Sequence, residues 1–418
     1  MALSGRGISR VMANNERLGV AIVGLGGAVA TTAVAGLELL RRGRVDTKGL
    51  PLAAARDLGL IDYEALTFGG WDLFEDDLAQ AARNHAVLTE SQLEAVAPVL
   101  SQMRPWSAVS NTSFCKNVVG TSSKKTRSLR EQVQAIRDDL ARFRKEQGVH
   151  RVVVINLAST ERAVDLTQPK FLTPEAFEAA LDADDPDIGP AMLYAYAAIA
   201  DGTPFANFTP SIAADVPALL LLAQRNGSPL AGKDGKTGQT MLKTVIAPAL
   251  RDRALHVEGW YSTNILGNRD GEALNDPASK ANKIDTKGAA LDSILGYKVQ
   301  DHIVQIQYYR PRGDNKEAWD NIDVVGFLGQ PMQLKLNFLC KDSILAAPLV
   351  VELARTLDLA KRRGEAGVID ALGCFFKAPM TQNGGKVEHA MAEQQRRLMS
   401  WLSGGGVQPV LGKERIRG

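Results

Sequence analysis

The alternation of apolar and polar segments along the chain predicts an α/β protein. Residues 19–24 (GVAIVG) and 151–159 (RVVVINLAS) are nearly continuous apolar runs, as is typical of strands buried on both faces of a parallel sheet. Residues 30–42, 128–147 and 188–200 have the apolar periodicity of helices. Strands that alternate with helices indicate a parallel sheet covered by helices.

The pattern changes near residue 300. The run HIVQIQYYRP at 302–311 alternates apolar and polar side chains, as expected for a strand with one solvated face, and the apolar runs VVGFLG and MQLKLNFL follow after short turns. Successive strands joined by short turns predict an antiparallel sheet in this part of the chain. Residues 342–361 return to a helical pattern, which we expect to be broken or bent at Pro348.

A glycine-rich turn follows the first predicted strand. Gly24, Gly26 and Gly27 would allow the backbone to come close to a pyrophosphate, whose charge the N-terminus of the next helix would favour. Val29 stands where the G-x-G-x-x-G pattern has its third glycine, so a simple tight turn is the alternative. Asp72, at the end of the second strand-like run, is either an acceptor for a ribose hydroxyl or an acidic helix cap.

Two polar segments are candidates for binding a phosphorylated ligand. Residues 232–240 (GKDGKTGQT) lack the ending of a P-loop, so they are either a phosphate nest at a helix start or an ordinary loop. The segment YSTNILGNRDGEALNDPASKANKIDTK carries Lys280, Lys283 and Lys287, which would share one face of a helix and form either a solvated basic surface or the partner of an anion. Lys377, in GCFFKAPM, is either a partly buried ammonium group or one that reaches solvent from an apolar patch.

Composition narrows the class of protein. The chain has 418 residues, enough for two or three domains, and its net charge of +2 gives no global attraction to nucleic acid or membrane. Its three cysteines and five histidines show no metal-ligand spacing, and no apolar run approaches the roughly 20 residues that span a bilayer. We therefore expect a cytoplasmic protein that binds neither nucleic acid nor membrane.

Several motifs together resemble one family. The motifs GLGGAVATT, GGWD, GKDGKTGQT, LGNRDG, the Lys283/Lys287 pair, GDNK, CKDSILAAP and FFKAP occur between Gly19 and Met380 in the order found in the myo-inositol-1-phosphate synthases, and the chain resembles their bacterial branch. The resemblance implies an NAD-dependent, redox-neutral isomerase that cyclises D-glucose 6-phosphate to 1D-myo-inositol 3-phosphate, for inositol and phospholipid biosynthesis. In that reaction NAD oxidises carbon 5, a proton leaves carbon 6, the enolate attacks carbon 1 and the hydride returns.

The resemblance also implies site residues. Lys283, Lys287, Lys316 and Lys377 are similar to the family's four active-site lysines. Lys283 and Lys316 would exchange a proton at the carbon 5 oxygen, Lys287 would hold phosphate, and Lys377 would stabilise the carbon 1 oxygen. The implied NAD-binding residues are Gly24, Gly26, Gly27, Ala28, Val29, Asp72, Ala158, Thr160, Asp234, Asp270, Asp342 and Ser343. The implied substrate-binding residues are the four lysines with Thr237, Gly238, Gln239, Thr240, Asn264, Leu266 and Asn268.

The fold implied by the resemblance is a Rossmann-like NAD-binding domain with an inserted domain. Residues 1–244 and 345–418 would form the NAD-binding domain, and residues 245–344 an α+β catalytic domain through which a homotetramer assembles. Family members are assisted by divalent cations or by monovalent or ammonium ions, and the sequence does not select between them.

Some positions depart from the common family pattern. Ala28-Val29-Ala30 stands where Asn-Asn-Gly is frequent, Arg269 replaces a frequent asparagine, and Thr237 replaces a frequent serine. One alternative is therefore a related cyclase that acts on another hexose or ketose phosphate, such as fructose 6-phosphate. The other is a non-catalytic NAD-binding regulatory protein, against which the retention of all four lysines argues.

Overall fold

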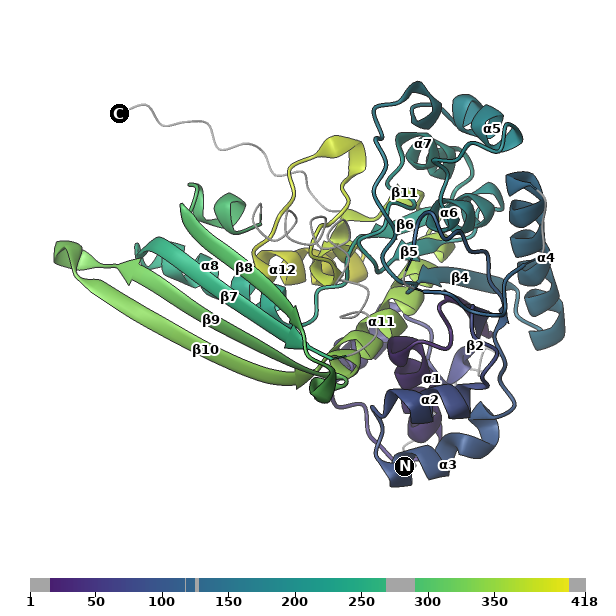
Figure 1. The fold of residues 1–418 in the computed structure, drawn as a ribbon, viewed down its shortest axis with the longest axis horizontal. Helices are drawn as coiled ribbons and strands as arrows, with labels where there is room; N and C mark the ends of the chain where they lie inside the picture. Colours follow the sequence, from purple (N-terminus) through teal and green to yellow (C-terminus); the bar gives the residue numbers. More distant parts are fainter. Residues whose placement is uncertain (1–15, 117, 125–127, 268–289, 406–418) are drawn as a thin grey trace, which may run out of the picture.

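The computed structural model describes residues 16–116, 118–124, 128–267 and 290–405. Figure 1 shows two sheets, one enclosed by helices and one extending away from them. The predicted α/β class is confirmed, with a parallel sheet and a second, smaller sheet.

The larger sheet is parallel throughout and has seven strands in the order β11-β6-β5-β4-β1-β2-β3. From β1 the chain adds strands first on one side, as β2 and β3, and then on the other side, beginning with β4. Open α/β sheets bind ligands at such a switch point, beyond the carboxyl ends of the strands. The strands are β1 (Leu18–Val23), β2 (Leu66–Asp72), β3 (Trp106–Ser107), β4 (Arg151–Asn156), β5 (Phe205–Asn207), β6 (Pro229–Gly232) and β11 (Gly367–Val368).

Helices cover both faces of this sheet because its strands are apolar on both sides. In β1, Leu18, Val20 and Ile22 belong to one core cluster, and Ala21 and Val23 belong to the other. The first cluster includes residues of α1 (Ala28–Arg41), α2 (Leu78–His85), α3 (Glu90–Leu100), α11 (Asp342–Arg362) and α12 (Met391–Leu402). The second includes residues of α4 (Leu129–Gln147), α5 (Pro174–Asp182), α6 (Pro190–Ala200) and α7 (Pro217–Arg225).

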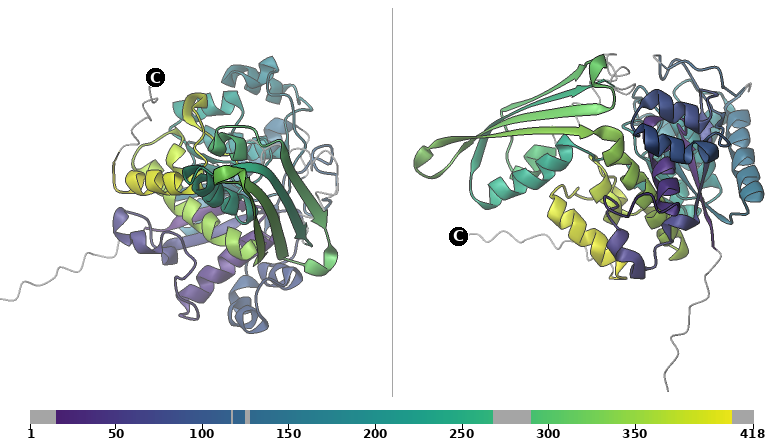
Figure 2. Two further views of the ribbon diagram at one scale, coloured as in Figure 1. Left: turned by 90° about the vertical axis from the view of Figure 1, so that its left-hand side faces the viewer. Right: turned by 90° about the horizontal axis from the view of Figure 1, so that it is seen from below.

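The smaller sheet has four strands in the order β10-β9-β7-β8 and projects from the main body in the right-hand view of Figure 2. Its strands are β7 (His256–Leu266), β8 (Asp301–Tyr308), β9 (Asn315–Val325) and β10 (Pro331–Lys341). Helix α8 (Gln239–Asp252) packs on it, with Ala247 and Leu250 against Trp260, Ile322 and Val324.

Two expectations about these elements need correction. β7 and β8 are parallel, so the smaller sheet is mixed and not purely antiparallel; a long connection separates these two strands, as parallel neighbours require. α11 continues through Pro348, because its extensive burial outweighs a local cost of about 3 kcal/mol for a proline inside a helix.

Short 3₁₀ helices connect several of these elements. One of them, η6, comes shortly before Lys377, and another, η4, comes just before β9. They are η1 (Ala53–Leu58), η2 (Tyr63–Ala65), η3 (Pro169–Phe171), η4 (Arg310–Arg312), η5 (Phe327–Gly329), η6 (Asp370–Phe375) and η7 (Gln382–Gly384).

Candidate active site

A cavity of about 580 Å³ lies at the carboxyl ends of β1, β2 and β4, next to the switch point of the larger sheet. Its volume falls within the range of about 300–1,000 Å³ that is usual for sites that bind small molecules and cofactors. The candidate residues that line it are Gly24, Gly26, Gly27, Ala28, Val29, Asp72, Ala158, Thr160, Asp234, Thr237, Lys316, Asp342, Ser343 and Lys377.

The glycine turn forms one wall of the cavity. Gly24 has a φ of +89°, which side chains rarely adopt, and its amide donates to Trp71 O at 2.8 Å. The amide of Gly27 donates to Gly24 O at 3.0 Å, and α1 begins at the next residue. A Cβ on Gly27 would lie 3.1 Å from Gly24 O. The turn therefore brings backbone and the N-terminus of a helix to the cavity, as a bound pyrophosphate requires.

Asp72 holds this turn in place. Its Oδ2 accepts from the amide of Gly26 at 2.8 Å, and its Oδ1 accepts from the amide of Phe74 at 3.1 Å. His85 completes the arrangement, because its Nε2 lies 2.8 Å from Gly26 O and a carbonyl oxygen can only accept. Nothing in the sequence pattern indicated His85, which lies at the end of α2 and lines the cavity.

Two lysine–aspartate pairs stand on another part of the cavity wall. The Nζ of Lys316, on β9, donates to Asp342 Oδ1 at 3.2 Å, and the Thr237 hydroxyl donates to the same oxygen at 3.0 Å. The Nζ of Lys377 donates to Asp234 Oδ1 at 2.7 Å. Residues that are far apart in the sequence thus place two ammonium groups in the cavity that contains the glycine turn.

Asp234 can accept a further hydrogen bond besides the one from Lys377. It is 3% exposed, and its Oδ2 has no hydrogen-bond partner among the described residues. A buried carboxylate oxygen without a partner is costly, so a donor from a bound ligand would stabilise it. In the same described part of the chain, no group of three or more His, Cys, Asp and Glu side chains could hold a metal ion.

The structure places only part of the predicted phosphate loop at the cavity. Thr237 lines the cavity, whereas α8 begins at Gln239 with Gly238 as its N-cap residue. The side chains of Gln239 and Thr240 are buried, and Gln239 is directed toward the smaller sheet. If these residues bind phosphate, Gln239 does so through its backbone and not through its side-chain amide.

Several predicted residues lie elsewhere. Asn264 and Leu266 are buried in β7 and do not line the cavity. Ser343 lines it, but its hydroxyl donates to Asp314 Oδ1 at 2.6 Å. The remaining predicted residues lie outside the described part of the chain: Asn268, Asp270, Lys283 and Lys287.

Glu161 lines the cavity just beyond the carboxyl end of the strand predicted at 151–159, where open α/β sheets bind ligands. It is 7% exposed, and burial raises the pKa of its carboxyl group to about 8. Its Oε1 accepts from the amide of Ala191 at 2.9 Å, in the first turn of α6. That contact and the helix N-terminus favour the charged form, so two effects of opposite sign act on this group.

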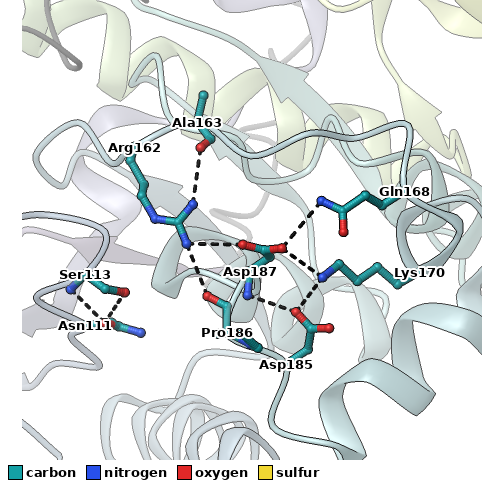
Figure 3. A network of polar contacts seen from close by, with 9 residues as sticks. All are labelled: Asn111, Ser113, Arg162, Ala163, Gln168, Lys170, Asp185, Pro186 and Asp187. Atoms are coloured by element: carbon teal, nitrogen blue, oxygen red, sulfur yellow. Dashed lines mark hydrogen bonds and ion pairs between the residues drawn. The ribbon is translucent and has the colours of Figure 1, made fainter.

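A network of charged groups holds the segment that follows Glu161 (Figure 3). Arg162 Nη2 and Lys170 Nζ contact the two carboxylate oxygens of Asp187 at 3.3 and 2.9 Å, and Lys170 also contacts Asp185 at 2.7 Å. The Arg162 guanidinium lies 4.2 Å from the ring centre of Phe114, which lines the cavity. The network therefore supports the cavity wall from outside.

Comparison with known proteins agrees with this geometry. The family model described as myo-inositol-1-phosphate synthase, an NAD-binding family, matches residues 52–403. The chain belongs to the myo-inositol-1-phosphate synthase family. An inositol-3-phosphate synthase 1 of Bacteroides thetaiotaomicron is 40% identical to it, over 92% of this chain and 95% of that protein. The predicted family membership is thereby confirmed.

Solved structures support the fold of this family member. An inositol-3-phosphate synthase of Caenorhabditis elegans superposes with a TM-score of 0.86 at 24% identity, over 93% of this chain and 85% of that one. A myo-inositol-1-phosphate synthase-related protein of Thermotoga maritima superposes with a TM-score of 0.76 at 26% identity, over 93% and 98% of the two chains. Within the described residues, no helix has the length and apolar character needed to cross a membrane.

Proposed function

We propose that this protein is an NAD-dependent inositol-3-phosphate synthase that isomerises D-glucose 6-phosphate to 1D-myo-inositol 3-phosphate without net oxidation. One observation carries the proposal beyond family membership. Lys316 and Lys377, each paired with an aspartate, line the same cavity as the glycine turn at Gly24–Gly27. A cofactor turn and proton-donating groups around one cavity are what this redox-neutral cyclisation needs.

The residues at the turn fit NAD. Gly24, Gly26 and Gly27 leave room that Cβ atoms would fill, and the N-terminus of α1 is available for the pyrophosphate. Asp72 holds Gly26 so that this opening persists. When bound, NAD supplies reversible hydride transfer. The other proposed NAD contacts in the described cavity are Ala28, Val29, Ala158, Thr160, Asp234, Asp342 and Ser343, and Asp270 is proposed from the resemblance alone.

The lysines are the proposed acid–base groups. Lys316 would give and take a proton at the carbon 5 oxygen together with Lys283, and Lys377 would stabilise negative charge on the carbon 1 oxygen. Asp342 and Asp234 compensate the ammonium charges and orient Nζ through their hydrogen bonds. Lys287 is proposed to hold phosphate; Lys283 and Lys287 lie outside the described residues.

The phosphate group of the substrate is proposed to lie at the start of α8. The backbone amides of Gly238, Gln239 and Thr240 provide donors at this helix N-terminus. Thr237 connects the phosphate loop to the catalytic pairs, because its hydroxyl and Lys316 share Asp342 Oδ1. Asn264, Leu266 and Asn268 are proposed to surround the sugar.

We also propose a cytoplasmic homotetramer with the domain division 1–244 plus 345–418 and 245–344. The smaller sheet supports assembly through the second domain, because Phe327 and Leu328 at the β9–β10 turn are 88% and 76% exposed and Leu339 is 61% exposed. Such exposed apolar groups are usual at contacts between subunits. The product would serve inositol phospholipid synthesis, and a divalent or monovalent cation would assist as in other family members.

Incubation of the purified protein with glucose 6-phosphate and NAD tests the proposal. Phosphorus NMR should show inositol 3-phosphate, with no net accumulation of NADH, and the Lys377→Met variant should bind NAD without forming product. Conversion of fructose 6-phosphate in place of glucose 6-phosphate would identify the related cyclase. NAD binding without turnover of either sugar would identify the non-catalytic alternative.

A further inference from the structure

Beside the cavity, a buried carboxylate organises the contact between α8 and the smaller sheet. Asp320, on β9, is 1% exposed. Its Oδ1 accepts from Trp260 Nε1 at 2.7 Å and from the Ser262 hydroxyl at 2.6 Å, and its Oδ2 accepts from Gln239 Nε2 at 3.1 Å. All three donors are neutral, and Gln239 is the first residue of α8. These neutral donors and the nearby ammonium group of Lys243 together stabilise the charge of Asp320.

This carboxylate decides how the neighbouring amides are oriented. An ionised carboxylate can only accept, so Gln239 must present its NH₂ group to Asp320 and its Oε1 to the other side. There Oε1 accepts from Asn264 Nδ2. A flipped Gln239 would place Oε1 against the carboxylate, which is repulsive. Asp320 therefore sets the direction of the hydrogen bonds in the series Asp320–Gln239–Asn264.

The series ends in an acceptor. Because Asn264 gives its NH₂ group to Gln239, its Oδ1 is left over; this oxygen is buried and has no partner among the described residues. Asn264 is 1% exposed, and such an oxygen is stabilised only when a donor reaches it. Asn264 lies on β7 two residues before Leu266, whose register partner is Lys316.

We propose that Asp320 is a positioning residue for the sugar-phosphate site. Its negative charge holds Gln239 against the sheet, which fixes the first turn of α8, and it keeps Asn264 Oδ1 as an acceptor for a hydroxyl group of the sugar. The inference rests on the proposed function, since it assigns α8 and Asn264 to substrate. It adds the residue that determines their orientation; like Asn264, Asp320 does not itself line the cavity.

The Asp320→Asn variant should raise KM for glucose 6-phosphate by about tenfold or more, because the first turn of α8 and the acceptor at Asn264 are both lost. Trp260 Nε1 can only donate, so it favours the new amide with its oxygen toward Trp260 and its NH₂ group toward the NH₂ group of Gln239. Gln239 and then Asn264 would flip in response. NAD affinity should stay unchanged, because the glycine turn belongs to the larger sheet. Asp323→Asn is the matched control: Asp323 lies on the same strand and also accepts from amides, those of Asn321 and Gln333, at 2.8 Å each.

A double variant shows whether Asp320→Asn acts by reversing the hydrogen bonds of Gln239 and Asn264 or only by destabilising the protein. In Gln239→Glu with Asp320→Asn, the carboxylate moves to position 239, accepts from the new side-chain amide at position 320 and from Asn264, and restores the original orientation of Asn264. KM should be lower than in either single variant, because Asp320→Asn alone loses the orientation of Asn264 and Gln239→Glu alone places two carboxylates together. This rescue is not expected if Asp320 only contributes to packing.

The outcomes test the proposed function and the role of Asp320 separately. An inactive wild-type protein would overturn the proposed function before the variants are considered. An active wild type with an unchanged KM in Asp320→Asn would overturn the role of Asp320, as would a double variant no better than either single variant. If Asp320→Asn does not fold, the double variant still decides, because only restored polarity predicts its recovery.

Discussion

Alanine at Gly70 is expected to displace the NAD-binding turn, because β1 and β2 pass too close at this residue for any side chain. Gly70 pairs with Ile22 in the parallel register of these two strands and has a φ of +149°. A Cβ built there would lie 2.0 Å from Ile22 O and 2.6 Å from Ile22 N. Both atoms are backbone of a central strand, so they cannot move aside as a side chain can.

The size of the effect follows from this geometry. The strands must separate by more than about 1 Å to restore an ordinary contact, which breaks neighbouring ladder hydrogen bonds worth about 1 kcal/mol each and adds about 1–3 kcal/mol of backbone strain. A total of about 4 kcal/mol is a large share of the roughly 5–15 kcal/mol that stabilises a domain. The shift would also carry Trp71, which accepts from Gly24, and Asp72, which accepts from Gly26.

Thermal unfolding and NAD titration of Gly70→Ala measure both consequences. We expect a melting temperature lowered by several degrees and a loss of NAD affinity. Gly36→Ala is the control, because Gly36 lies inside α1 with nothing within 4 Å of its would-be Cβ, and alanine should stabilise that helix by up to about 1 kcal/mol. A Gly70→Ala protein that melts and binds NAD like wild type would refute the reasoning.

Three further predictions concern single side chains. Burial lowers the pKa of Lys243 to about 8, so between that pH and the unfolded value near 10.5 the unfolded chain holds a proton that the folded chain has lost. Urea unfolding should therefore show stability rising with pH across this window, by about 3 kcal/mol at most, and Lys243→Met should flatten the rise. Asp72→Ala should weaken NAD binding about tenfold in calorimetry, because two backbone donors lose their acceptor. Lys316→Met should abolish turnover yet bind NAD like wild type in the same titration.

The elements with a strong local pattern were predictable from the sequence. β1 and β4 are apolar on both faces, and the turn at Gly24 follows directly from a strand, a glycine and a helix in succession. Local patterns do not show which distant residues meet. Lys316 and Lys377 could be placed around one site only through the family resemblance, because β9 and the segment after η6 are brought together by the fold.

The features that sequence analysis missed depend on tertiary contacts. Asp320, in AWDNID, has the composition of a solvated strand position, yet α8 and β7 bury it almost completely. His85 lies among ordinary polar residues, and only the approach of α2 to the glycine turn places it at the cavity. The parallel pairing of β7 with β8 likewise depends on chain path and not on residue pattern.

The location of the cavity between two sheets explains why α11 is both long and buried. The larger sheet supplies the glycine turn, whereas the smaller sheet supplies Lys316 near the start of β9. Hydride transfer and proton transfer on one sugar require these walls at a fixed separation, since small displacements are costly in catalysis. α11 begins at Asp342, directly after β10, where it accepts from Lys316, and then packs along the core of the larger sheet. The helix therefore ties the acid–base groups to the cofactor turn, and its continuity through Pro348 serves that rigidity.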